Sequence, residues 1–149
     1  MSAEENSYNL INLNNNNNKT YADDKASMPY NLEAEQSFLG AILFDNTTIE
    51  NTMDLIKDYH LYEPLHQEIY QACLILFDNN KLADPTTLKG YLRDENPNRK
   101  IDISDYLNKL KGSVLSISNI NSYANEIKNC YLRRCLIRIS NDIKENSLN

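Results

Sequence analysis

One pattern recurs along most of this chain and restricts what it can fold into: a residue that starts a helix is followed by apolar residues at helical spacing. Asn31 precedes "LEAEQSFLGAIL", Pro64 opens "PLHQEIYQACLILF", and Asp84 with Pro85 opens "DPTTLKGYL". Asn and Asp accept hydrogen bonds from the first N–H groups of a helix, and a proline at the first helical position needs no such partner. Each segment is therefore predicted to be a helix with its apolar stripe facing inward.

The composition agrees with a helical fold. Three Gly and four Pro among 149 residues argue against a loop-rich or all-β chain. A chain of this length buries about two thirds of the surface that it exposes when unfolded, so it can build a core without disulfides. We predict an all-α fold: a compact bundle of about five to six helices that ends in a long helix.

The chain divides into three regions. Residues 1–28 are polar, with an Asn run from Asn14 to Asn18, and bury too little apolar surface to offset the entropy of ordering, so we expect a disordered tail. Residues 29–117 carry the bundle. In 118–149 no Pro or Gly interrupts the pattern, which predicts one helix of about 25 residues, longer than the usual 11 or 12. Such a helix either projects beyond a small bundle or pairs with a partner segment.

Charge, cysteines and hydropathy exclude several classes of protein. A net charge of −6 argues against sequence-independent DNA affinity, which rests on Lys and Arg. Cys73, Cys130 and Cys135 form no C-x-x-C pair and fit inert thiols in a reducing compartment. No apolar run reaches the roughly 18 residues of a membrane span, and the N-terminus has no signal-peptide pattern. We expect a cytoplasmic protein without membrane contact.

The first helix carries a carboxylate and a glycine where its packing face should be apolar. At about 100° per residue, Glu35 falls on the side that holds Leu39 and Ile42. Burial there favours either an acid with a raised pKa or a carboxylate held by a donor such as His66 or a loop amide, and we favour the second. Gly40, on the flank, permits close approach of a neighbouring helix. We predict structural roles for Glu35, Gly40 and His66.

Nothing in the sequence predicts a catalytic, cofactor or metal site. There is no G-x-x-x-x-G-K-[ST] motif, and three scattered glycines cannot build a phosphate-binding loop. His60 and His66 lie six residues apart without a Cys or His at ligand spacing. A small enzyme that uses Glu35 and His66 stays open as an alternative, and it requires the two to share an accessible pocket.

The last helix is the predicted contact surface. Its segment "KNCYLRRCLIRI" mixes three arginines with apolar residues distributed widely around the helix. One interpretation is a solvated basic edge, and the other is a helix that docks on another subunit. Tyr, the dominant aromatic residue of the whole chain, is common at such interfaces. We predict an interface at Tyr131, Arg134, Leu136 and Ile139; a phosphate site formed by the arginines is disfavoured because the rest of the chain is acidic.

An ordered series of six segments resembles the N-terminal domain of the bacterial replicative DNA helicase, the DnaB family. The segments are "PYNLEAEQSFLGAIL" (29–43), "LYEPLHQEIYQA" (61–72), "DPTTLKGYL" (84–92), "DYLNKL" (105–110), "NINSYANEI" (119–127) and "RRCLI" (133–137). The resemblance covers Pro29 to Ile137. One departure is that "IDIS" (101–104) replaces a Gly pair often found before the "YL..L" block, which affects the local loop geometry.

The resemblance implies a function that the composition alone does not. Members of the family are hexameric, ATP-driven helicases that encircle single-stranded DNA, and their ATP- and Mg-binding motor lies in a C-terminal domain that this sequence does not contain. The N-terminal domain is a helical bundle followed by a helical hairpin; hairpins pair subunits, three pairs form a collar, and primase docks there. The helix over 118–149 would be the first arm of the hairpin, truncated before its partner, with apolar surface left exposed.

The resemblance thus implies a non-catalytic domain that associates with itself and binds primase, in the cytoplasm of a bacterium or in an organelle of bacterial descent. A helicase loader is a further expected partner, and contact with DNA is expected of the parent ring. Two alternatives stay open: the helicase-binding domain of a primase, which has a similar fold, and a stand-alone replication adaptor. The "AEQ..LGAIL" and "DPTT" blocks favour the helicase.

Overall fold

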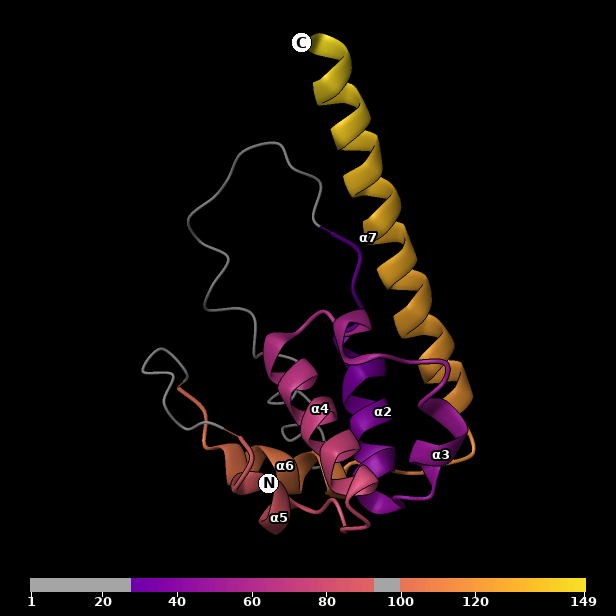
Figure 1. The fold of residues 1–149 in the computed structure, drawn as a ribbon. Helices are drawn as coiled ribbons and strands as arrows, with labels where there is room; N and C mark the ends of the chain where they lie inside the picture. The colour runs from indigo at the N-terminus through magenta and orange to yellow at the C-terminus, as the bar shows by residue number, and fades with distance from the viewer. Residues whose placement is uncertain (1–27, 93–99) are drawn as a thin grey trace, which may run out of the picture.

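The computed structural model describes residues 28–92 and 100–149. Within these ranges the chain forms six α-helices and one 3-10 helix, η2, and no strand (Figure 1). The elements are α2 (Leu32–Phe44), α3 (Thr48–Thr52), η2 (Asp58–His60), α4 (Pro64–Asp78), α5 (Pro85–Lys89), α6 (Ile103–Gly112) and α7 (Ile120–Leu148). The all-α prediction is confirmed. The tail predicted over 1–28 lies outside the described residues except for Met28, and so do residues 93–99.

Helix α2 is the centre of the bundle. It packs against α6 and α7 and also contacts α3 and α4 (Figure 1). The sequence pattern predicted one apolar side for this helix, but ten of its 13 residues are buried, and Phe38 and Ala41 are fully buried. Helices surround α2 on several sides, so small and aromatic residues outside the expected stripe are also removed from water.

The helix starts follow the predicted capping chemistry. The side chain of Asn31 accepts a hydrogen bond from the N–H of Ala34 at 2.9 Å. The Asp84 carboxylate accepts from the N–H groups of Thr86 and Thr87 at 2.8 and 2.9 Å. Pro64 begins α4, as predicted. These ends are fixed by residues next to them in sequence, so the local pattern was sufficient.

From the polar cluster "DNTT" (45–48), the sequence predicts Asp45 or Asn46 as the cap of α3, and this prediction is wrong. Thr47, and neither Asp45 nor Asn46, stands at its N-cap position. The Asp45 carboxylate accepts from the Thr47 N–H and hydroxyl instead. Asn46 donates to the Ala83 carbonyl and accepts from the Ala83 N–H, at 2.9 and 2.7 Å. Asn46 therefore ties the segment before α5 to the end of α2, a long-range role that capping rules do not reveal.

The last helix is one uninterrupted element of 29 residues. Its first part packs on α2, and its C-terminal part extends away from the bundle as a rod (yellow in Figure 1). A single long helix was predicted here over 118–149, and Asn119 stands at its N-cap position.

Candidate subunit-contact surface

A buried carboxylate joins α2 to the segment that leads into α4. Glu35 is 2% exposed. One of its oxygens, Oε1, accepts a hydrogen bond from the N–H of Tyr62, and the other, Oε2, accepts from the N–H of Glu63 at 3.3 Å. Oε2 also lies 2.6 Å from Nδ1 of the buried His66. Glu35 thus anchors α2 to both a loop and α4.

The hydrogen-bonding partners fix the order of donors in this cluster. The amide nitrogen of Gln36 donates to the Tyr106 hydroxyl at 3.2 Å, so the phenol proton is free to point at His66 Nε2, 2.7 Å away. Nδ1 of His66 donates to Glu35, whose two oxygens act as acceptors. Burial raises the pKa of Tyr106, which keeps the phenol neutral. Four side chains from α2, α4 and α6 therefore satisfy one another inside the core.

This cluster does not form an accessible catalytic site. The side chains of His66 and Glu35 are 0% and 3% exposed. The alternative of a small enzyme built on these two residues required a shared accessible pocket, and their burial contradicts it.

Gly40 lies on the side of α2 that packs closely against α6. A Cβ added to Gly40 would lie 2.5 Å from the Leu110 carbonyl oxygen and 2.8 Å from Val114 Cγ2. The first of these atoms belongs to the backbone of α6, so it cannot move without moving the helix. A residue with a side chain at this position would push α6 away from α2.

Among the four predicted interface residues, Arg134 lies inside the chain, which corrects its assignment. It is 4% exposed, and its guanidinium donates to the carbonyl oxygens of Pro29 and His60, each at 2.8 Å. Tyr131 is half-buried, with its ring 4.6 Å from the ring of His60. The sequence could not reveal the burial of Arg134, because its two acceptors lie 105 and 74 positions away along the chain.

The other two predicted residues lie on an exposed apolar stripe. Leu136 is 65% and Ile139 is 55% exposed, and Leu132 and Ile143 continue the series at spacings of four, three and four residues. At about 100° per residue these four side chains point about 150° away from the buried face of α7. We call them the α7 stripe. The spacing is that of the apolar seam of paired helices.

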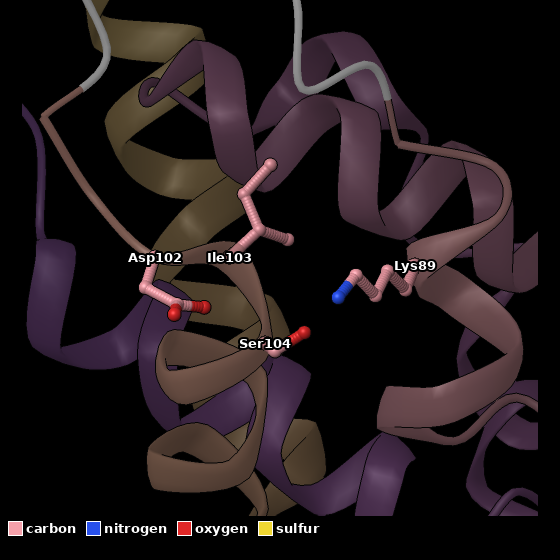
Figure 2. A pocket seen from close by; sticks show the side chains of 4 residues that line it. All are labelled: Lys89, Asp102, Ile103 and Ser104. Carbon is pink, nitrogen blue, oxygen red and sulfur yellow. The ribbon is translucent and has the colours of Figure 1, made fainter.

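A hollow between α5 and α6 is a further feature of the described surface. It has a volume of about 270 Å³ and is lined by Lys89, Asp102, Ile103 and Ser104. Figure 2 shows the Lys89 ammonium group extending across it toward Ser104. The Asp102 carboxylate accepts from the N–H of Asp105 at 3.1 Å and so caps α6. One exposed lysine and a capping carboxylate do not make a catalytic set.

Residues 28–92 and 100–149 also bear on metal binding and on membrane contact. They hold no group of three or more His, Cys, Asp or Glu side chains able to bind a metal ion. None of their helices combines the length and the apolar character that a membrane crossing requires.

Comparison with known proteins connects this geometry to one family. A family described as the DnaB-like helicase N terminal domain matches residues 27–129. The chain is 30% identical over 140 residues to the replicative DNA helicase DnaB of Rickettsia bellii, covering 90% of this chain and 28% of the relative. It is 33% identical over 117 residues to DnaB of Pasteurella multocida, covering 78% and 25%. The chain therefore spans about a quarter of the length of these relatives.

Solved structures share the fold. The N-terminal domain of DnaB helicase from Mycobacterium tuberculosis has a TM-score of 0.74 at 28% identity, with 82% of this chain and 87% of that chain covered. The N-terminal domain of DnaB helicase from Helicobacter pylori, studied together with its interactions with primase, has a TM-score of 0.67 at 21% identity, with 78% and 90% covered. The match over residues 27–129 and the shared fold show that the chain belongs to the DnaB-like helicase N-terminal domain family.

Proposed function

We propose that this chain is the oligomerisation and primase-interaction domain of a replicative DNA helicase. The observation that carries the proposal is the α7 stripe, an apolar seam on the side of α7 that faces away from the bundle. Family membership supplies the context, since the relatives are replicative helicases. It also favours the helicase over the alternative of a primase domain.

The size of the stripe indicates how strong pairing through α7 can be. Two stripes packed together would bury eight apolar side chains, each contributing about 1.5 kcal/mol. The sum, about 12 kcal/mol, is comparable to the 4–15 kcal/mol that association costs in lost freedom. Pairing through α7 alone is therefore expected to be weak, and a second hairpin arm would strengthen it.

In the parent protein, this domain would form part of a collar above a hexameric motor ring. ATP and Mg would bind in the motor domain, and single-stranded DNA would pass through the ring. Primase and a helicase loader are the proposed partners of the collar, and the replication fork in the cytoplasm is the proposed site of action. The Helicobacter pylori domain, studied for its interactions with primase, supports the choice of primase.

The self-association test uses one substitution in the stripe and one matched control. Leu136→Asp introduces a charge into the seam, whereas Leu82→Asp changes a residue of similar exposure, 62% against 65%, before α5. Light scattering should show a mass that rises with concentration for the wild type and for Leu82→Asp, and a monomer for Leu136→Asp with unchanged helicity. Equal masses for all three would contradict the proposal.

The primase test is a calorimetric titration with the helicase-binding domain of a primase from the same organism. Saturable binding with the wild-type chain is the expected result. The absence of binding, with the chain shown to be folded by circular dichroism, would remove primase as a partner of this domain.

A further inference from the structure

Helix α7 has an anchored half and a free half, and Arg134 marks the boundary. The buried residues of this helix are Ile120, Ala124, Ile127, Cys130 and Arg134, and no residue of α7 after Arg134 is buried. Figure 1 shows the second half leaving the bundle. Arg134 is thus the last residue of α7 whose side chain is buried.

Two backbone carbonyls from distant segments hold the Arg134 guanidinium. Nη1 donates to the carbonyl oxygen of Pro29, just before α2, and Nη2 donates to that of His60, at the end of η2. Both distances are 2.8 Å, short enough for charge-assisted hydrogen bonds. A planar fork that bridges two fixed acceptors restrains rotation as well as position, which a single hydrogen bond does not.

Aromatic rings flank the same guanidinium. Its central carbon lies 5.4 Å from the ring centre of Tyr62 and 5.8 Å from that of Tyr131, within the range of cation–π attraction. Tyr62 stacks on Tyr30 at 4.6 Å, and Tyr131 lies 4.6 Å from the ring of His60. The segments that supply the two carbonyls therefore also supply rings that brace α7.

We infer that Arg134 is a positioning residue, a latch that fixes the angle between the free half of α7 and the bundle. The latch consists of Arg134, the carbonyls of Pro29 and His60, and the rings of Tyr62 and Tyr131. The latch determines the direction in which the free half projects, and the free half carries three of the four residues of the α7 stripe. Its consequence for pairing rests on the proposed function, whereas the angle itself is a property of this chain alone.

Geometry shows why the angle matters. The 14 residues from Cys135 to Leu148 span about 21 Å at 1.5 Å per residue. A change of about 15° at the latch would move the tip of this arm by about 5 Å, which is about half of the 8–10 Å between the axes of packed helices. An arm that swings by this much cannot keep one register with a partner helix.

The test measures distances between pairs of spin labels in dilute, monomeric chain. The background is Cys73→Ala, Cys130→Ala and Cys135→Ser. One label is placed at Gln71, an exposed residue of α4, and the second at Asn141 on the free half or at Asn125 on the anchored half, both exposed. The pair that includes Asn125 is the matched control on the same helix.

Two substitutions open the latch by different amounts. Arg134→Met removes both hydrogen bonds and keeps the length and packing of the side chain. Arg134→Lys keeps the charge but cannot bridge both carbonyls with a planar fork, and it serves if the Met variant fails to fold. Asn141 lies about 10 Å along the helix from Arg134, so the same change of about 15° would move it by about 3 Å. We expect the Gln71–Asn141 distances to shift or broaden by about 3 Å in Arg134→Met and by less in Arg134→Lys, with the Gln71–Asn125 distances unchanged.

Two results would overturn the latch. Unchanged Gln71–Asn141 distances would show that Arg134 does not set the angle of the free half. An equal change in the Gln71–Asn141 and Gln71–Asn125 distances would show that Arg134 positions the whole of α7 and does not specifically set the direction of its free half. Failure of the proposed function is separate: Leu136→Asp would then associate like the wild type, whatever the label distances are.

Discussion

At the scale of single residues, Glu35 shows why an acid sits on the packing face of the first helix. Its carboxylate accepts from two backbone N–H groups and from His66, all of which are buried or partly buried. A buried donor without an acceptor costs about 1–3 kcal/mol. The acid is therefore needed because the loop before α4 brings its N–H groups into the core.

We predict that Glu35→Ala lowers the free energy of unfolding by about 3 kcal/mol, because it leaves these donors without an acceptor. Glu35→Gln should lie between Ala and wild type, since its amide offers one acceptor oxygen but turns an NH₂ group toward another donor. Urea unfolding followed by circular dichroism measures both. A Glu35→Ala variant as stable as the wild type would show that the anchor contributes nothing.

Gly40 gives a second prediction at this scale. Gly40→Ala should destabilise the chain by about 1–3 kcal/mol, because its Cβ would meet the α6 backbone at Leu110. Gly112→Ala is the matched control: an added Cβ there has no neighbour within 4 Å, and its φ is not positive. Thermal unfolding should rank Gly112→Ala at or above the wild type and Gly40→Ala below it. The reverse order would contradict the close approach of α2 and α6.

At the scale of elements, the starts of α2, α4 and α5 were predictable from the sequence, whereas the contacts of Arg134 and Asn46 with distant segments were not. Asn31 and Asp84 act on residues two or three positions away, so a local pattern identifies them. Arg134 and Asn46 act on partners that only the folded chain brings near, so the same kind of pattern misassigned both. Of the predicted interface residues, Leu136 and Ile139 proved exposed because the apolar spacing of α7 continues beyond the bundle.

Asp84 caps the N-terminus of α5, and this contribution to the stability of the helix can be tested. Asp84→Ala removes the acceptor for Thr86 and Thr87 and should cost about 1 kcal/mol, with Asp84→Asn costing less. The hydrogen bond from the Thr87 N–H lowers the pKa of Asp84. The stabilisation is thus present above the ordinary carboxyl pKa and is lost as the pH falls through the lowered value. Urea unfolding at neutral and acidic pH should show the Ala variant approaching the wild type in acid; an unchanged difference would contradict this.

At the scale of the whole molecule, the bundle serves as a rigid base for a projecting helix. Glu35 and Gly40 hold α2 against α4 and α6, α2 holds the first half of α7, and the latch at Arg134 directs the second half outward. The buried side-chain polar groups of the described residues are paired, and α7 exposes a regular apolar series, the α7 stripe, most of it on the projecting arm. This distribution is that of a domain built to present one helix to another.

In the proposed function, a second copy of the chain covers the α7 stripe. Hydrogen–deuterium exchange of the wild-type chain at low and high concentration tests it most directly. We expect the amides of residues 136–148 to exchange fast when dilute and to gain protection as the concentration rises, with the amides of α2 unchanged. If light scattering shows that the chain associates but exchange over 136–148 stays fast at every concentration, the contact lies elsewhere. That result would contradict pairing through the α7 stripe.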